Sequence, residues 1–280
     1  MTDPVFVANA VMSLAALGAC AWHAAPDRDR LAFLAAGVVY GVILEQLVIV
    51  AFDAYHYNAA DFLLTLGDVP LVIGFGWAAI IYAGFEIARA FDLSTRARPP
   101  FVALFALHID LAIDAVAIRV PFWTWTPPGV WFGVPLGNFT GWFLVALLFP
   151  AAWLALCDRL SSRLLLAPAV LVSAVLALVV LLEGWTTFVE TTPLKVVVLG
   201  TALLVSLAVV LRGGPAPGPI DPRITAVPAL YHGFYLALLV GFRMYESQPA
   251  ILLVSLAMVG LSLLLHVPGL RGVRQAVSAA

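Results

Sequence analysis

Two aspartates one helical turn apart lie inside an apolar segment, and several tryptophans follow them. Asp110 and Asp114 are spaced i and i+4, which places both carboxyls on one face of a helix. Carboxylates this close repel, so at least one should keep its proton near neutral pH and serve as an acid. The tryptophans that follow are Trp123, Trp125, Trp131 and Trp142. Aromatic faces stabilise cations, so the pattern predicts acid-initiated cation chemistry on an apolar substrate.

A third acid, Glu45, lies in the middle of another apolar segment, VILEQLVIV. An ionisable group inside a membrane segment is a functional candidate because its burial in hydrocarbon is costly. Shortly after it come two phenols and an imidazole, Tyr55, His56 and Tyr57, in the string AFDAYHYN. We therefore expect these residues to contribute to the same site. Glu86, by contrast, is three residues before Arg89, which favours a local ion pair.

Each of these groups has a structural alternative. The aspartate pair could form an ion pair with Arg119 or with Arg243 from another segment, and Glu45 could make an interhelical polar contact. Tyrosine and tryptophan are also common at membrane interfaces. Asn138 could hold a water molecule or cap a helix. The residues alone leave these alternatives open.

Several cofactor signatures are absent from the sequence. It has no histidine clusters of the membrane di-iron type, no pair of Asp-x-x-x-Asp motifs and no GxGxxG motif. The two cysteines, Cys20 and Cys157, lie in different apolar segments and form no recognisable motif. We therefore expect no metal and no cofactor.

The composition is that of an integral membrane protein. Hydrophobic residues make up 63% of the 280 residues and charged residues only 11%, whereas soluble domains carry about a quarter. The formal net charge of −2 is spread along the chain, which argues against a nucleic-acid partner. The expected partners are therefore membrane lipids and an apolar substrate. Nothing in the sequence indicates an oligomeric state.

Nine segments are long and apolar enough to span a bilayer, which needs about 20 residues each. They are approximately residues 5–23, 31–52, 68–89, 101–120, 135–156, 164–183, 194–211, 226–243 and 250–268. The sequence predicts an all-α polytopic bundle of nine helices, or eight, in a single transmembrane domain over 1–280. The first segment has no basic stretch before it and should be retained as a helix rather than cleaved. A Pro/Gly-rich loop is expected at 213–222.

The distribution of basic residues predicts the orientation. Eleven of the 14 Lys and Arg residues fall in alternate connections and the C-terminal tail, leaving Arg119, Lys195 and Arg243 on the other side. Cytoplasmic loops are enriched in Lys and Arg, so the N-terminus should lie outside and the C-terminus and the 213–222 loop in the cytoplasm. The tyrosine and tryptophan segments then belong to the outer half of the bundle.

The first half of the chain resembles bacterial and archaeal membrane proteins of carotenoid biosynthesis that include the carotenoid 1,2-hydratases. The matching pieces are Glu45 with AFDAYHY, GDVPLVIGFGWAAIIYA at 67–83, DLAIDAVAIRVPFWTW at 110–125 and WFGVPLGNFTGWF at 131–143. Two positions differ from the usual pattern. Ala115 stands where the family often has Pro, and Asp53 where it often has Gly.

The resemblance implies a multi-pass enzyme of the bacterial or archaeal cytoplasmic membrane. It would add water to the terminal double bond of an acyclic carotenoid, without a cofactor. Asp110, Asp114 and Glu45 would be the catalytic acids and bases. Substrate would contact Tyr55, His56, Tyr57, Trp77, Trp123, Trp125, Asn138 and Trp142, with Asn138 holding the water.

Two other functions fit the same residues. A carotenoid or isoprenoid cyclase or isomerase would use the same acids and aromatic rings but lose a proton instead of capturing water. A non-catalytic carotenoid- or lipid-binding protein, or a proton-coupled transporter, would use the intramembrane acids differently. The transporter would be favoured by inverted repeats with broken helices, and the sequence shows none.

Overall fold

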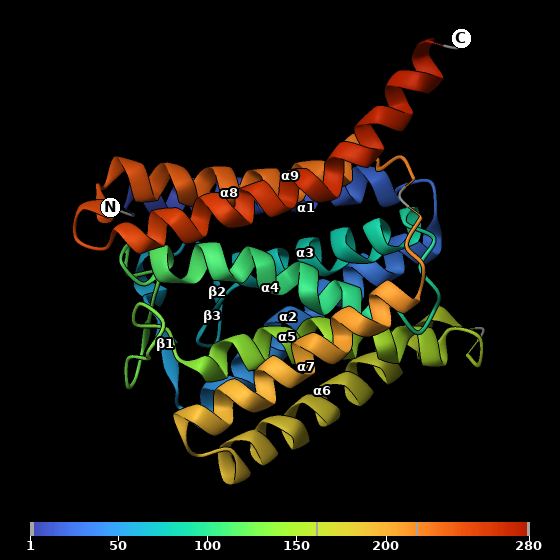
Figure 1. The fold of residues 1–280 in the computed structure, drawn as a ribbon. Coiled ribbons are helices and arrows are strands. Elements are labelled where there is room, and N and C mark those ends of the chain that lie inside the picture. The colour runs from blue at the N-terminus through green and yellow to red at the C-terminus, as the bar shows by residue number, and fades with distance from the viewer. Residues whose placement is uncertain (1–2, 161, 217, 279–280) are drawn as a thin grey trace.

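The computed structural model is a bundle of long, roughly antiparallel helices (Figure 1). It describes residues 3–160, 162–216 and 218–278, with side chains described up to Leu265. The helices in this part of the chain are α1 (Pro4–Ala24), α2 (Arg28–Phe52), α3 (Leu71–Ala90), α4 (Arg98–Ala117), α5 (Leu136–Leu156), α6 (Arg163–Phe188), α7 (Thr192–Arg212), α8 (Pro222–Gly241) and α9 (Pro249–Ser278). The predicted all-α polytopic bundle is confirmed.

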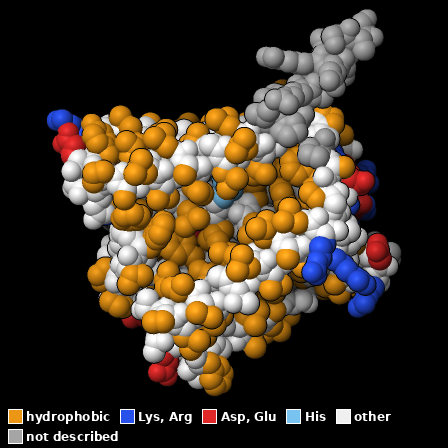
Figure 2. Space-filling view, in the orientation of Figure 1, with side chains coloured by type: hydrophobic (Ala, Val, Ile, Leu, Met, Phe, Trp, Pro, Cys, Tyr) orange, Lys and Arg blue, Asp and Glu red, His pale blue; other side chains and the backbone are white. Residues whose placement is uncertain are grey.

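Eight of these helices, α1 to α8, are long and apolar enough to cross a membrane. In α9 the apolar stretch with described side chains is the shorter Pro249–Leu265. In Figure 2 hydrophobic side chains cover the middle of the visible face, and charged side chains lie at its margins, near the helix ends. This distribution suits a bundle surrounded by lipid.

Two helices begin earlier than the sequence suggested. Asp27 caps α2 by accepting hydrogen bonds from the backbone N–H groups of Asp29 and Arg30, which places Arg28–Arg30 inside the helix instead of in the loop. Pro99 and Pro100 lie in the first turn of α4, where proline is tolerated because the N–H groups there have no helical partner. α4 ends at Ala117, so Arg119 lies beyond it.

The centre of the bundle is formed by α3 and α4. Each has 83% of its most apolar window buried, compared with 28% for α6 and 11% for α7. α3 packs against α1, α2 and α4, and α4 also packs against α5, α8 and α9. The α6–α7 hairpin therefore lies at the edge of the bundle (Figure 1). The acids of α2 and α4 face its interior.

Two short strands join connections that are far apart in the chain. β1 (Tyr55–Tyr57) pairs antiparallel with β4 (Trp123–Trp125), and Tyr55 lies opposite Trp125. The 52–71 connection also contains a 3-10 turn, η1 (Ala59–Asp61), and a small hairpin, β2 (Thr65–Leu66) with β3 (Val69–Pro70); another turn, η2 (Met244–Glu246), precedes α9. β1 lies at the same end of the bundle as the N-terminus, and the C-terminus lies at the other (Figure 1). This is the end predicted to face outward.

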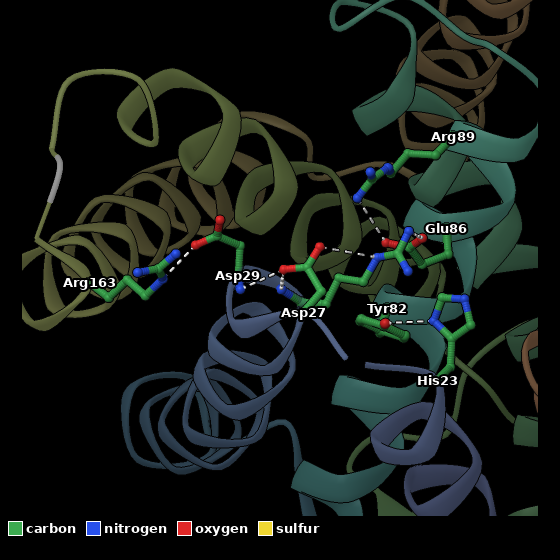
Figure 3. A network of polar contacts seen from close by, with 8 residues as sticks. His23, Asp27, Asp29, Tyr82, Glu86, Arg89 and Arg163 are labelled. Atoms are coloured by element: carbon green, nitrogen blue, oxygen red, sulfur yellow. Dashed lines mark hydrogen bonds and ion pairs between the residues drawn. The ribbon is translucent and has the colours of Figure 1, made fainter. Parts of the chain in front are cut away.

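The opposite end of the bundle carries a network of charged residues (Figure 3). Glu86 is 3.3 Å from Arg89 and 3.2 Å from Arg30, so the predicted Glu86–Arg89 ion pair is confirmed and has a second partner. Arg163, at the start of α6, reaches Asp29 at 2.5 Å and ties α6 to α2. Glu86 is therefore held in an ion-pair network, which distinguishes it from the other intramembrane acids.

Candidate active site

A cavity of about 640 Å³ lies beneath the β1–β4 strand pair. Two acids, Glu45 and Asp114, and one basic residue, Lys195, line it, and most of its remaining wall is apolar or aromatic. The lining includes nine residues predicted for the site: Glu45, Tyr55, Tyr57, Trp77, Asp114, Trp123, Trp125, Asn138 and Trp142. Its volume is in the range of small-molecule sites.

Glu45 accepts three hydrogen bonds in the interior of the bundle. The Trp77 indole donates to Oε1 at 2.6 Å, Tyr57 donates to Oε2 at 2.8 Å, and the Tyr55 hydroxyl also donates to Oε2. Glu45 is 6% exposed, and none of the ion pairs among the described residues involves it. Neutral donors thus hold this carboxyl in place without neutralising it by a basic residue.

Asn138 bridges the two aspartates of α4. Its amide nitrogen donates to Asp110 Oδ2 at 3.0 Å and to Asp114 Oδ2 at 2.8 Å. Both carboxyls are almost fully buried, and Asp110 Oδ1 has no hydrogen-bond partner among the described residues. Asp114 lines the cavity and Asp110 does not. The pair is therefore asymmetric, with Asp114 in front and Asp110 behind it.

Neither arginine suggested as an ion-pair partner reaches the aspartates. Arg119 donates to the backbone carbonyls of Ala115 and Phe132 and, at 2.6 Å, to the side chain of Gln248. Arg243 pairs with Glu246 at 2.5 Å. The aspartate pair is thus held by an amide, not by a cation.

The strand pair turns its aromatic side chains toward the cavity. Tyr55 and Trp125 have ring centroids 4.7 Å apart, and Tyr57 and Trp123 5.9 Å apart. Burial, and the nearby Glu45 charge, raise the pKa of both tyrosine hydroxyls well above its ordinary value, so they remain hydrogen-bond donors. The indoles of Trp123 and Trp125 face Asp114. Phenol and indole groups therefore surround both acids.

Trp77 and Trp142 form a second aromatic contact in the cavity wall. Their ring centroids are 4.3 Å apart, and the residues come from α3 and α5. Since the Trp77 N–H is bonded to Glu45, the position of this indole is fixed at one edge. The pair gives the cavity a second rigid face that a planar or branched hydrocarbon could contact.

One predicted site residue lies elsewhere. His56 is exposed and does not line the cavity, and it stands opposite Thr124, which is also exposed. Side chains alternate between the two faces of a strand, so the tyrosines on either side of His56 point inward and the histidine points out. The structure does not bring His56 to the acids.

Among the cavity-lining residues that were not singled out from the sequence are four buried polar ones. They come from α1 and α8 and are Asn9, Ser13, Tyr231 and Tyr235. Each pair is spaced i and i+4, as are the two aspartates, and this spacing of polar groups in apolar helices was the available signal. The cavity therefore reaches across the bundle to the helices that pack behind α3 and α4.

The backbone accounts for one difference from the family pattern. Asp53 ends α2 with a φ of 46°, in the left-handed region that glycine adopts readily and aspartate tolerates. Either residue can therefore turn the chain from α2 toward β1. Ala115, the other difference, lies within α4.

Comparison with known proteins identifies the family. A family model described as "carotenoid biosynthesis protein" matches residues 5–211, which includes α1 to α7 and both strands of the aromatic pair. No curated protein and no solved structure matches the chain. Because the family model covers well over half of the sequence, this multi-pass membrane protein belongs to the carotenoid biosynthesis protein family.

Proposed function

We propose that the protein is a carotenoid hydratase, a hydro-lyase acting in the direction of water addition. It would hydrate the terminal trisubstituted double bond of an acyclic carotenoid end group to give a tertiary alcohol. The observation that carries the proposal is the placement of Asp114 and Glu45 in an aromatic cavity, where neither carboxyl belongs to an ion pair among the described residues. Family membership supports an isoprenoid substrate.

The reaction would begin with proton transfer from Asp114. The π electrons of the double bond take the carboxylic proton to form a new C–H bond, leaving a tertiary carbocation and an Asp114 carboxylate. Water then donates an electron pair to the cation and forms the C–O bond. The protonated alcohol returns its extra proton to a carboxylate, so the net change is the addition of one water.

The surrounding groups would stabilise the cation. Each aromatic face contributes about 0.5–2 kcal/mol to a nearby cation, and more in a site without bulk water. Tyr55, Tyr57, Trp123 and Trp125 of the strand pair, and Trp77 and Trp142 of α3 and α5, line the cavity. Glu45 would add a negative charge or accept a proton, and its three donors would keep it oriented.

Asp110 and Asn138 would position Asp114. The Asn138 amide holds one oxygen of each aspartate, and Asp110 has no access to the cavity. A proton on Asp110 would remove the charge repulsion between the two carboxyls. We therefore assign Asp110 and Asn138 to the orientation and protonation of Asp114, and not to direct contact with substrate.

Expression in a lycopene-producing bacterium tests the proposal. Pigments that gain the mass of one water, as measured by mass spectrometry, would support hydration. A pigment of unchanged mass with a shifted absorption spectrum would instead indicate a cyclase or isomerase, which loses a proton from the same cation. Unchanged pigment, with the protein present in the membrane, would count against both enzymes and favour a binding or transport role.

The resemblance also supports a cellular location. We propose a bacterial or archaeal cytoplasmic membrane, with the β1–β4 end facing outward, as the distribution of basic residues predicts. Cysteine labelling of an exposed residue at each end, His56 and Arg159, would test the orientation in intact cells. Labelling at residue 159 but not at residue 56 by a membrane-impermeant reagent would reverse it.

A further inference from the structure

The part of the cavity wall formed by α1 and α8 carries a second set of polar groups. Asn9 and Ser13 come from α1, and Tyr231 and Tyr235 from α8. All four residues are buried, with exposed fractions of 3–4%. α8 lies outside the part of the chain that matches the family model, so half of this wall is not covered by the family assignment.

These groups do not fully satisfy one another. Ser13 donates to Asn9 Oδ1 at 3.3 Å, and the Tyr231 and Tyr235 hydroxyls lie close to Ser13 and Asn9. Even so, Asn9 Nδ2 and the Tyr231 hydroxyl make no hydrogen bond of good geometry among the described residues. Leaving a buried donor without a partner destabilises a protein. Polar groups in such a position are commonly satisfied by a bound water molecule or a ligand oxygen.

The wall also lies close to the acids. The Tyr235 hydroxyl lies close enough to Asp110 and Asp114 to interact electrostatically with their carboxyls. The Tyr231 hydroxyl packs against Gly76 of α3, where an added Cβ would lie 2.8 Å from the hydroxyl oxygen. The two α8 tyrosines therefore connect the α1 polar groups to the site that holds Asp114.

Asn138 is poorly placed to hold the reacting water. Its amide nitrogen already donates to both aspartates, which uses its two N–H groups. Only its carbonyl oxygen is left to contact another molecule. A nucleophilic water is held near the cation by hydrogen bonds. Donors can contact its oxygen, and acceptors of its O–H groups fix the direction of its remaining lone pair. The α1–α8 wall offers such groups.

We propose that Asn9, Ser13, Tyr231 and Tyr235 form the subsite for the water that captures the carbocation. This inference rests on the proposed hydration and specifies where its second substrate binds. The subsite water forms the C–O bond with one electron pair. The resulting oxonium ion gives up a proton to the Asp114 or Glu45 carboxylate, so neither oxidant nor reductant is needed.

Protonation of the double bond and capture of water can be measured independently. Membranes containing the protein are supplied with a purified acyclic carotenoid in D₂O. Protonation followed by proton loss places deuterium in the recovered, unhydrated carotenoid, whereas water capture yields the alcohol. Mass spectrometry measures both. The variants are Tyr231→Phe, Asn9→Leu and their combination, with Tyr40→Phe as the control, because Tyr40 is a buried tyrosine outside the cavity.

The double variant should lower the alcohol by about tenfold or more while deuterium still enters the unhydrated carotenoid. The Tyr40→Phe control should match the unaltered protein. Alcohol formation at the unaltered rate in the double variant would overturn the subsite. An equal loss of alcohol and deuterium incorporation, with normal protein levels, would also overturn it, because the wall would then act in protonation or folding.

Failure of the proposed function would look different. The unaltered protein would then produce no alcohol, whether or not deuterium enters the carotenoid, and the subsite inference would fall with it. As a second structural test, Gly76→Ala should displace the Tyr231 hydroxyl without removing it. This variant should also lower the ratio of alcohol to deuterated carotenoid. An unchanged ratio would count against a role for Tyr231.

Discussion

The Trp77 indole nitrogen lies 2.6 Å from Glu45 Oε1, joining the central helix α3 to the acid of α2. Two tyrosine hydroxyls approach the other oxygen of the same carboxyl. Glu45 is thus an acceptor surrounded by donors. Its environment favours an acceptor in this position, and an amide in its place would turn an N–H group toward at least one of these donors.

Glu45→Gln should lower product formation about 100-fold or more, the usual range for loss of a general acid or base. The measurement is hydrated pigment per amount of inserted protein. Glu86→Gln is the matched control, because Glu86 is also a buried acid but is paired with Arg30 and Arg89 outside the cavity. It should retain activity and lose only thermal stability. Equal activity in both variants would contradict the role of Glu45.

The two aspartates should differ in effect. Asp114→Asn should lower product about 100-fold or more, because Asp114 lines the cavity, whereas Asp110→Asn should lower it about tenfold. Pigment analysis in the same host compares them. A larger loss at Asp110 than at Asp114 would reverse the assignment of donor and positioning residue.

The β1–β4 pair should show an alternating pattern of sensitivity. Tyr57→Phe removes a hydrogen bond to Glu45, and Trp123→Ala removes an aromatic wall, so both should reduce product. His56→Ala and Thr124→Ala should change it by less than about twofold, because these side chains point outward. Strong loss of activity in His56→Ala would show that the histidine reaches the substrate by a route that the strand geometry does not provide.

The tyrosine hydroxyls give an expectation for pH dependence. Because burial and the Glu45 charge raise the pKa of Tyr55 and Tyr57, both stay protonated in alkaline solution. Activity in membrane vesicles should therefore show no decline caused by these phenols up to their ordinary pKa of about 10. A decline below that value that disappears in Tyr55→Phe or Tyr57→Phe would contradict this.

The helices were predictable because a bilayer requires long apolar segments, and their positions agree with the structure to within a few residues at most ends. The same-face arrangement of Asp110 and Asp114 followed from their spacing. The β1–β4 pairing was not predicted, since three-residue strands carry little hydropathy signal. In retrospect, Tyr-His-Tyr and Trp-Thr-Trp share one alternation of aromatic and polar residues.

The i and i+4 spacing of polar groups in α1 and α8 did not by itself show that these helices reach the cavity. Asn9, Ser13 and the two α8 tyrosines are ordinary residues in membrane helices, and only the packing of α1 against α3 and α8 brings them to the cavity. The role of Asn138 was similarly hidden. From the sequence, its amide could bind water or cap a helix. The packing of α4 against α5 instead places it within hydrogen-bond distance of two carboxyls.

The cavity lies at the strand-pair end of the bundle, and this has a consequence for substrates with two identical ends. A long polyene aligned with the helices can place only one terminus beneath the strands at a time. Its second terminus would be processed after the molecule dissociates and returns reversed. A symmetrical substrate should therefore pass through a free mono-alcohol, which a time course of pigments would detect before any diol accumulates.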